Sequence, residues 1–304
     1  MIKIFGHKAP DTDATGSAII WSWFLETKDL ETTPYVLGTP NTEAAFVLKR
    51  WGYDTPALLE DVTADDMVVI VDTNNPAELP EHINDATIIE IIDHHMLVGG
   101  LKTKQPINVT IEPVASTATV MANMMGEELA TAPDAIKGLI LSCILSDTLE
   151  FRSPTTTDVD VEIAQAIAAE LDIDIASYAA EMFAAKSDIS HFSEAELLRL
   201  DSKQFEVDSV KLRVSVLETT SPQTVLSRKT SLMDAMAGVA SEDGVDHVLL
   251  FIVDILNEEA TLLIPNDTVK QIAEKSFDTT VSGDTVVLAG IVSRKKQIIP
   301  NLVV

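Results

Sequence analysis

The first twenty residues, MIKIFGHKAPDTDATGSAII, begin with a short run of strand-forming residues, Ile2–Phe5. A polar loop follows and leads into an amphipathic stretch, Ala14–Glu26, whose large apolar side chains repeat at helical spacing. A strand that passes through a short loop into a helix is the opening of a β-α-β unit. This segment therefore predicts an α/β fold that starts at the N-terminus.

The first half of the chain continues this alternation. Further strands are expected at Tyr35–Leu37, Met67–Val71, Ile88–Ile92 and Ile107–Ile111, and helices at Asn41–Trp51, Ser116–Met125 and Asp134–Ser146. Because these strands are apolar along their whole length, we expect a parallel sheet that is covered on both faces. In an open doubly wound sheet of this kind, ligands bind at the carboxyl ends of the strands.

The second half begins with a helical region, with Thr157 as a helix N-cap, and then returns to strands. Strands are expected at Gln204–Val207, Leu212–Leu217, Val248–Leu256, Thr261–Ile264, Val286–Ala289 and Gln297–Ile299, and helices at Ser231–Ala240 and Thr268–Phe277. A chain of 304 residues is long enough for two domains that share a cleft. We therefore predict domains at 1–187 and 195–304, the second a smaller mixed-sheet α/β domain, joined by a linker at 188–194.

The charge of the chain excludes some classes of partner. The formal net charge at pH 7 is −27, and residues 1–186 hold 30 of the 48 Asp and Glu residues. Nucleic acids and anionic membranes require a basic surface, so neither is expected as a partner. The first strand follows no long apolar stretch, which predicts a cytoplasmic protein.

Three potential metal ligands follow the first strand. His7 ends that strand, and Asp11 and Asp13 are expected in the loop that enters the helix. Imidazole and carboxylate together suit Mn, Zn, Co or Mg rather than the metals of thiolate sites. The alternative is that the two aspartates only cap the helix while His7 makes a strand-end hydrogen bond.

Other polar side chains interrupt apolar segments later in the first half. They are Asp72 after Met67–Val71, Asp93, His94 and His95 after Ile88–Ile92, and Asp147 in an apolar helical stretch. A strand-end carboxylate lies where α/β sites assemble, although turn formation would also favour Asp72 there. Adjacent histidines point to opposite sides of an extended chain, so one can bind a metal while the other meets the substrate. An ionised Asp147 near a core helix's end is costly unless it is paired or bound to a cation.

Taken in order, these elements resemble the DHH phosphoesterase superfamily. The shared order is His-x3-Asp-x-Asp, a strand-end Asp, the tripeptide Asp93-His94-His95 and a later Asp. The segment Glu112–Ala122, EPVASTATVMA, looks like that superfamily's helix-opening segment. The resemblance implies a metal-dependent hydrolase of phosphoester or phosphoanhydride bonds.

The second half distinguishes the branches of this superfamily. Relatives that cleave nucleic acid carry a glycine- and histidine-rich loop there, which this sequence lacks. Two other segments, VSRKKQIIP with Arg294, Lys295 and Lys296 between two expected strands, and DSKQFEV with Lys203, are similar to the second domain of the manganese-dependent family II inorganic pyrophosphatases. The alternative is that the basic cluster is a solvated strand edge that blocks aggregation and that Lys203 is ordinary surface.

The resemblance also implies a role for each residue. One cation would be held by His7, Asp11 and Asp72, and a second by Asp13, Asp72, His94 and Asp147, with Asp72 as the bridge. The cations would be two Mn²⁺ per subunit, with Co²⁺ or Mg²⁺ as substitutes, and would activate a water molecule for in-line attack on phosphorus. His95, Lys203, Arg294 and Lys295 would contact the substrate, inorganic pyrophosphate, in a cleft between the domains.

The family likeness further implies a homodimer. Three alternative functions remain open at this point: a DHH-type phosphodiesterase acting on short oligonucleotides or cyclic dinucleotides, an exopolyphosphatase, and a non-catalytic metal-binding regulatory protein.

Overall fold

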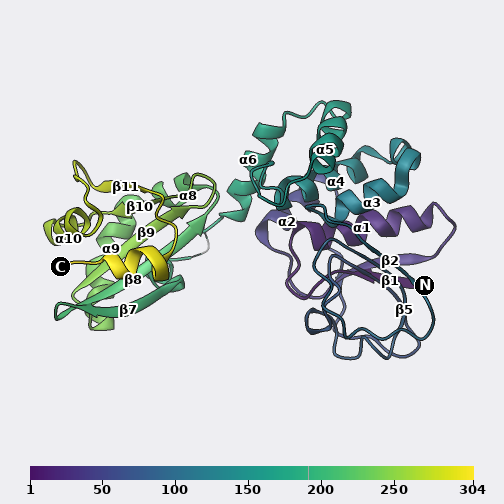
Figure 1. Cartoon of the computed structure of the whole chain (residues 1–304), viewed down its shortest axis with the longest axis horizontal. Coiled ribbons are helices and arrows are strands. Elements are labelled where there is room, and N and C mark those ends of the chain that lie inside the picture. Colours follow the sequence, from purple (N-terminus) through teal and green to yellow (C-terminus); the bar gives the residue numbers. More distant parts are fainter. Residues whose placement is uncertain (191) are drawn as a thin grey trace. The chain divides into compact units, whose positions relative to one another are not determined.

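The computed structural model describes residues 1–190 and 192–304 and divides into two units, Met1–Lys186 and Ser187–Val304. Figure 1 shows unit 1 in purple to teal and unit 2 in green to yellow. Residue 191, which belongs to the expected linker 188–194, lies outside the described residues. Within the described ranges, no helix has both the length and the apolar character needed to cross a membrane.

Unit 1 is built on a parallel sheet with the strand order β3-β2-β1-β4-β5-β6. Its strands are β1 Ile2–Phe5, β2 Thr32–Val36, β3 Ala57–Leu58, β4 Met67–Val71, β5 Thr87–Asp93 and β6 Asn108–Ile111. The order reverses at β1 and β4, and ligands of open α/β sheets bind beyond the carboxyl ends of strands at such a switch point. The parallel α/β fold predicted from the strand-helix alternation is confirmed.

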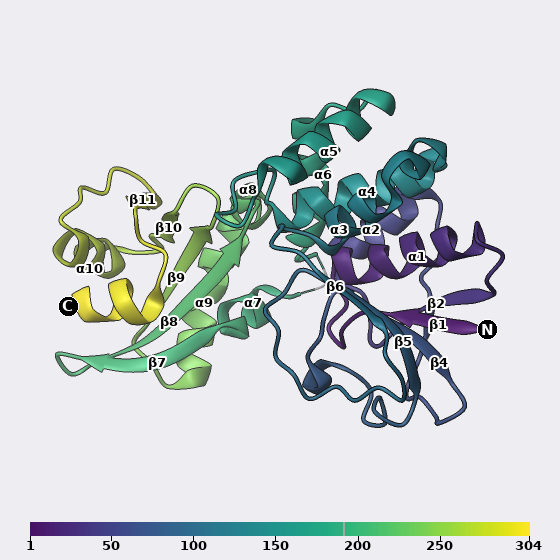
Figure 2. The ribbon, with the colours of Figure 1, turned by 45° about the vertical axis from the view of Figure 1, so that its right-hand side comes forward.

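Helices cover one face of this sheet and loops cover the other (Figures 1 and 2). The helices are α1 Thr12–Glu26, α2 Thr42–Trp51, α3 Thr117–Met125, α4 Asp134–Asp147, α5 Asp158–Glu170 and α6 Ile175–Lys186, with short 3-10 turns at Pro76–Glu78 and Gly126–Thr131. On the loop side, Leu59, Val62 and Ile83 pack against the buried side chains of the strands. Both faces are therefore buried, as their uniformly apolar strands predict.

Capping side chains determine where the helices of unit 1 begin. The Asp11 carboxylate accepts a hydrogen bond from the Ala14 backbone at 3.0 Å, and α1 begins at Thr12. Asp13 consequently lies in the first turn of the helix, and its expected position in the preceding loop was wrong. Thr157 caps α5 as predicted, in a reciprocal capping box with Asp160.

Unit 2 contains a mixed sheet with the order β11-β10-β9-β8-β7, in which only β8 and β9 are parallel. Its strands are β7 Ser202–Val207, β8 Val210–Thr219, β9 His247–Asp254, β10 Glu259–Leu263 and β11 Thr285–Ala289. Its helices are α7 Glu194–Leu200, α8 Pro222–Leu226, α9 Lys229–Asp243 and α10 Asp267–Phe277. The predicted mixed-sheet domain is confirmed, and β9 and β10 pair as an antiparallel hairpin.

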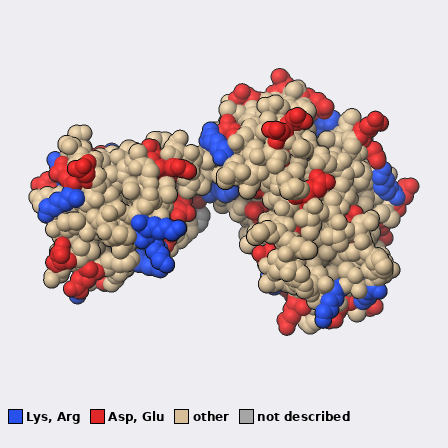
Figure 3. Space-filling view, viewed as in Figure 1, with Lys and Arg blue, Asp and Glu red and all other residues tan. Residues whose placement is uncertain are grey.

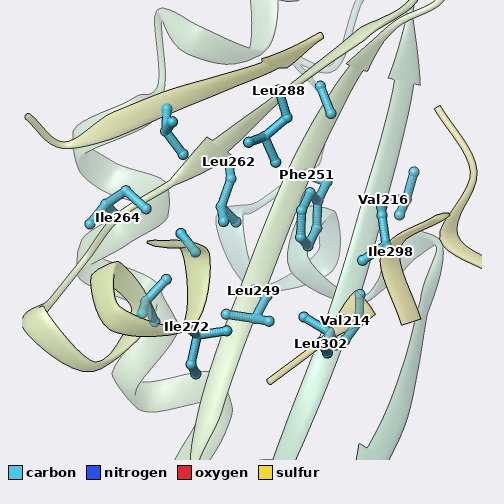
Figure 4. Close-up of a cluster of buried hydrophobic side chains, with 14 of the residues drawn as sticks. Val214, Val216, Leu249, Phe251, Leu262, Ile264, Ile272, Leu288, Ile298 and Leu302 are labelled. Atoms are coloured by element: carbon cyan, nitrogen blue, oxygen red, sulfur yellow. The ribbon is translucent and has the colours of Figure 1, made fainter. Parts of the chain in front are cut away.

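The central strand β9 is apolar on both sides because each face of the sheet carries its own core. Leu249, Phe251 and Val253 point into a core shared with α10 (Figure 4). The alternate residues Leu250 and Ile252 point into a second core shared with α7, α8 and α9. Successive strand residues face opposite sides, so one strand supports both layers.

The chain after β11 differs from the prediction. Residues Arg294–Ile298 form a single wide helical turn, followed by a 3-10 turn at Ile299–Asn301, and the expected strand Gln297–Ile299 was wrong. The Gln297 side chain explains the turn because its Oε1 accepts hydrogen bonds from the backbone of Val292 at 3.0 Å and Ser293 at 2.9 Å. These local bonds compete with strand pairing. Arg294 and Lys295 are therefore on a turn and not between two strands.

Candidate active site

The six candidate metal ligands meet at the carboxyl edge of the parallel sheet in unit 1. His7 follows β1, Asp11 and Asp13 open α1, Asp72 follows β4, His94 follows β5, and Asp147 ends α4. Ligand atoms within 4.8 Å of one another define the groups His7–Asp11–Asp72 and Asp13–His94–Asp147. The structure thus brings together all six residues that the sequence singled out, at the switch point of the sheet.

The first group surrounds the His7 imidazole. Its Nε2 lies 3.4 Å from Asp72 Oδ2 and 3.7 Å from Asp11 Oδ2. Burial lowers the pKa of His7, but the carboxylates of Asp11 and Asp72 outweigh that effect and raise it to about 10. A histidine between two carboxylates in this geometry offers a site where a cation can replace the ring proton.

The second group is centred on His94. Its Nδ1 lies 3.1 Å from the carbonyl oxygen of Val114, so the Nδ1 hydrogen is donated to that acceptor and Nε2 is left to bind elsewhere. Nε2 is 3.5 Å from Asp72 Oδ1 and 3.8 Å from Asp147 Oδ2, yet it is buried and has no hydrogen-bond partner. A buried nitrogen without a partner, aimed at two carboxylates, fits a metal ligand.

Helix α3 holds two of these carboxylates through its first turn. The backbone N–H groups of Thr117 and Ala118 donate to Asp13 at 2.6 and 3.2 Å. The Thr117 hydroxyl donates to Asp72 Oδ1 at 2.9 Å. Partial positive charge at a helix N-terminus stabilises a carboxylate, which explains how Asp13 is accommodated with no exposed surface.

The carboxylates and imidazoles of the site shift one another's ionisation. Burial and the charge of Asp72 raise the pKa of Asp13 to about 7, and burial together with Asp13 and Asp72 raises the pKa of Asp147 well above its usual value. Burial also disfavours the ionised form of Asp72, but the imidazoles of His7 and His94 hold its pKa well below the usual range. Two divalent cations would neutralise the four carboxylates of the two groups.

His95 lies beside these groups but its ring is held differently. Its Nδ1 is 3.9 Å from Asp72 Oδ1 and 2.9 Å from Asp93 Oδ1, so its hydrogen-bond partner is Asp93. The Asp93 carboxylate raises the pKa of His95, whose side chain is 53% exposed. With Asp72 and His94 it forms a third group of potential ligands. His94 is half-buried and His95 is exposed.

The basic residues singled out in the second half gather around one cavity of unit 2. Lys203 on β7 and Arg294 and Lys295 on the turn after β11 line a cavity of about 470 Å³. Arg294 donates to Asp201 twice, to its carboxylate at 2.7 Å and to its carbonyl oxygen at 2.8 Å. Figure 3 shows acidic side chains scattered over the visible face and Lys and Arg confined to a few patches. Asp201 and Glu218 line the same cavity, so it presents two carboxylates beside its three cations.

Some residues of the site carry no signal that a single sequence reveals. Asp201 binds Arg294, and Asn74 binds Asp93 at 2.6 Å, each across a long separation in sequence. Thr117 lies in the segment EPVASTATVMA, which the resemblance marked but to which it gave no role. Only the folded sheet brings these partners together.

Comparison with known proteins identifies the family. The profile of the DHH family N-terminal domain matches residues 1–146, and that of the DHHA2 domain matches residues 180–303. A Deinococcus radiodurans protein is 38% identical over 99% of this chain and 98% of its own length. One from Lactobacillus acidophilus is 35% identical over 98% and 96%. Both bear the name "Probable manganese-dependent inorganic pyrophosphatase".

Solved structures agree with this. The crystal structure titled "Methanococcus jannaschii putative family II inorganic pyrophosphatase" is 33% identical, with a TM-score of 0.63 over 99% of this chain and 98% of that one. An exopolyphosphatase-related protein from Bacteroides fragilis, 14% identical with a TM-score of 0.51 over 98% and 89%, shares the fold. The two family domains in this order and the full-length identity with relatives place the chain in a single family. The chain therefore belongs to the family II inorganic pyrophosphatases, which join a DHH domain to a DHHA2 domain.

Proposed function

We propose that this chain is a manganese-dependent inorganic pyrophosphatase, which hydrolyses pyrophosphate to two orthophosphates. The observation that carries the proposal is similarity over nearly the whole chain to relatives of that name. The buried and unpartnered Nε2 of His94, among carboxylates at the switch point of the sheet, supports it independently. That arrangement suits a divalent cation, which would replace the proton that otherwise pairs this nitrogen with Asp72 and Asp147.

The proposed ligand sets follow the two groups of side chains. His7, Asp11 and Asp72 would hold one Mn²⁺, and Asp72 would share the second with Asp13, His94 and Asp147. The two oxygens of Asp72 face different histidines, which is what a bridging carboxylate requires. When bound, two divalent cations would lower the pKa of a water molecule toward neutrality and polarise phosphoryl oxygens. Co²⁺ or Mg²⁺ could substitute, since hard oxygen and nitrogen ligands accept several metals.

The remaining residues would bind and orient the substrate. Arg294 offers a planar fork to phosphate oxygens, while Lys203 and Lys295 supply point charges. His95 presents an exposed imidazole beside the ligand His94 and would donate a hydrogen bond or proton to a phosphate oxygen. Each of these residues would stabilise the negative charge that pyrophosphate carries and the additional charge that the departing phosphate gains.

Phosphate release by metal-stripped protein tests the proposal. Pyrophosphate, a tripolyphosphate and a dinucleotide are supplied in turn, with Mn²⁺ or Mg²⁺ titrated separately. We expect fastest turnover of pyrophosphate with Mn²⁺. Faster cleavage of the dinucleotide or of longer polyphosphate would reassign the chain to a phosphodiesterase or an exopolyphosphatase, and metal binding without any phosphate release would make it a regulatory protein.

A matched pair of histidine variants locates the activity. His94→Gln removes the unpartnered nitrogen and should abolish Mn²⁺-dependent hydrolysis. His82→Gln changes an exposed histidine that pairs only with Asp61 and should leave hydrolysis unchanged. Equal activity in the two variants would contradict the proposed site.

The family likeness also leads us to propose a cytoplasmic homodimer without nucleic-acid or membrane partners. The net charge of −27 supports the absence of polyanionic partners. Light scattering on the purified protein tests the oligomeric state, and a monomeric mass at working concentration would overturn it.

A further inference from the structure

Asn74 is a buried amide that the proposed mechanism does not use. It follows β4, two residues beyond Asp72, and only 3% of its surface is exposed. Its Nδ2 donates to Asp93 Oδ2 at 2.6 Å and to the carbonyl oxygen of Met96 at 3.1 Å, and its Oδ1 accepts from the Val98 backbone at 2.8 Å. Both hydrogens of the amide and its carbonyl are therefore engaged.

These bonds connect Asn74 to the residues on either side of His95. Asp93 is fully buried at the end of β5, and Met96 and Val98 belong to the loop that follows. The side chains of Met96 and Val98 are 89% and 62% exposed, so apolar packing does not hold this loop. The Asn74 amide fixes the backbone of the loop at Met96 and Val98, next to His95, and Asn84 holds it farther along at Gly100 and Lys102.

Asp93 in turn holds the His95 ring. Its Oδ1 accepts from the backbone of His94 at 2.8 Å, from the backbone of His95 at 3.1 Å, and lies 2.9 Å from His95 Nδ1. An ionised carboxylate can only accept hydrogen bonds. The Nδ1 atom must therefore carry a hydrogen, and Nε2 is the ring nitrogen left to face a ligand.

We propose that Asn74 and Asp93 are positioning residues that fix the tautomer and the direction of the His95 ring for the hydrolytic reaction. Neither residue reaches the candidate substrate contacts itself. Asn74 holds Asp93 from behind and fixes the loop after His95, and Asp93 fixes Nδ1. The inference rests on the proposed function, because it assigns His95 to the substrate.

The alternative is a purely structural role, in which Asn74 and Asp93 only satisfy buried polar groups. Both readings lower stability when the amide is removed. They differ in the His95 ring of the Asn74 variants, since only the positioning role requires the ring to lose its Nδ1–H tautomer or its direction when the amide is removed. They also differ in kinetics, because a ring that acts in the transition state changes kcat more than KM.

The first test is the ring tautomer in the wild-type protein. ¹⁵N NMR of the metal-free protein distinguishes Nδ1–H from Nε2–H imidazole, with His95→Gln identifying the signal. We expect hydrogen on Nδ1 and a bare Nε2 in the neutral ring. A neutral ring with hydrogen on Nε2 would overturn the proposal, and this readout needs neither metal nor activity.

The second test uses matched Asn to Asp variants at adjacent positions. Asn74→Asp removes the donor and places a second carboxylate against Asp93. Asn75→Asp is the control, because the Asn75 side chain only accepts a hydrogen bond from Ala77 at 3.1 Å, which a carboxylate also does. We expect Asn74→Asp to lower kcat for pyrophosphate about 10- to 100-fold with little change in KM, as loss of an outer partner of a site residue does. The control should match wild type.

If Asn74→Asp does not fold, kcat, KM and the His95 tautomer are measured on Asn74→Ala instead. In either folded variant, an unchanged kcat together with an unchanged His95 tautomer would overturn the positioning role. The wild-type assay separates the two levels of inference. A wild type that releases no phosphate from pyrophosphate with Mn²⁺ refutes the proposed function, whereas an active wild type beside an equally active Asn74 variant refutes only the positioning role.

Discussion

Replacement of Asp72 by Asn tests whether one carboxylate serves both proposed cation sites. The backbone of Asp72 has φ 59°, in the left-handed region that most residues avoid. Asn is one of the few residues that tolerates this conformation, so Asp72→Asn preserves the backbone. Asp72→Ala would add strain, and a change in metal affinity would then have two causes. The Asn variant is therefore the informative one.

The structure predicts an unequal effect on the two sites. Thr117 donates its hydroxyl hydrogen to Asp72 Oδ1, so an Asn side chain would place its carbonyl oxygen there, on the His94 side. The NH₂ group would then face His7, where Oδ2 lies 3.4 Å from the imidazole in the wild type. An NH₂ group cannot ligate a cation. The site of His7 loses a ligand, whereas the site of His94 loses only charge.

These losses translate into affinity. Loss of an outer partner that does not ligate the metal already costs a site about 10- to 100-fold in affinity. We expect a loss in this range at the His94 site, which keeps an oxygen ligand, and a loss of about 100-fold or more at the His7 site, which loses a ligand. At a Mn²⁺ concentration of about 1,000 times the wild-type Kd, stabilisation by one site would fall from about 4.1 to about 1.4 kcal/mol for a 100-fold loss. Metal-free stability should also fall, because the imidazoles of His7 and His94, which hold the pKa of Asp72 below its usual range, lose their charged partner.

Calorimetric titration with Mn²⁺ measures both affinities, and thermal melting with and without Mn²⁺ measures the linked stabilisation. Asp65→Asn, at an exposed turn position before β4, is the control for loss of one negative charge. Two sites of wild-type affinity in Asp72→Asn would refute the bridging role. Weakening of the His7 site alone, with the other unaltered, would confine Asp72 to one site and refute sharing.

Three further predictions concern unit 2 and the core. Arg294→Lys should lower kcat/KM about 10- to 100-fold despite the retained charge, since a charged hydrogen bond of about 1.5–3 kcal/mol is lost, and unchanged pyrophosphate hydrolysis would count against substrate binding. Gly138→Ala would place a Cβ 2.2 Å from two indole carbons of Trp51, so it should lower the free energy of unfolding by about 1–3 kcal/mol; an unchanged melting temperature would contradict this close contact. The pKa of Glu194 is lowered to about 2, chiefly by Arg228, so its stabilising effect exists above the ordinary Glu pKa and disappears as pH falls toward 2. Glu194→Gln should therefore have a lower melting temperature than wild type at pH 7 and the same melting temperature near pH 2. A difference in melting temperature that grew as the pH fell would contradict this prediction.

The longer strands of both units could be predicted because their buried residues are apolar, whereas the two-residue strand β3, Ala57–Leu58, was missed because both of its residues are exposed. The strand Met67–Val71 was predicted with its observed bounds, since four of its five side chains are buried and apolar. Asp13 was wrongly placed in the loop because the first residue of the helix depends on one hydrogen bond, from the Ala14 backbone to Asp11, and this bond starts the helix at Thr12. The strand expected at Gln297–Ile299 failed for a similar reason, since Gln297 binds its own local backbone. The pattern of apolar residues predicts that a helix or strand is present, whereas single polar contacts determine the residue at which it begins or ends.

The candidate site shows the same division between what sequence predicts and what folding adds. Candidate ligands such as His7, Asp72 and His94 were found because they directly follow apolar strands, and parallel strands end at one edge. Asn74 and Asp201 were missed because each has a partner on a distant element and an ordinary sequence context. The residue pattern of one segment cannot indicate a contact with a residue that lies far away in the sequence.

The segment from Val114 to Ala118 explains why the site is specified so closely. Its backbone and hydroxyl groups contact three candidate ligands: the Val114 carbonyl binds His94, Thr117 and Ala118 bind Asp13, and the Thr117 hydroxyl binds Asp72. These contacts leave Nε2 of His94 and Oδ1 of Asp72 facing each other at 3.5 Å. A displacement of this one turn would move ligands of both proposed cations together. The first turn of α3, although it supplies no candidate ligand, therefore determines the geometry that the candidate ligands present to a metal.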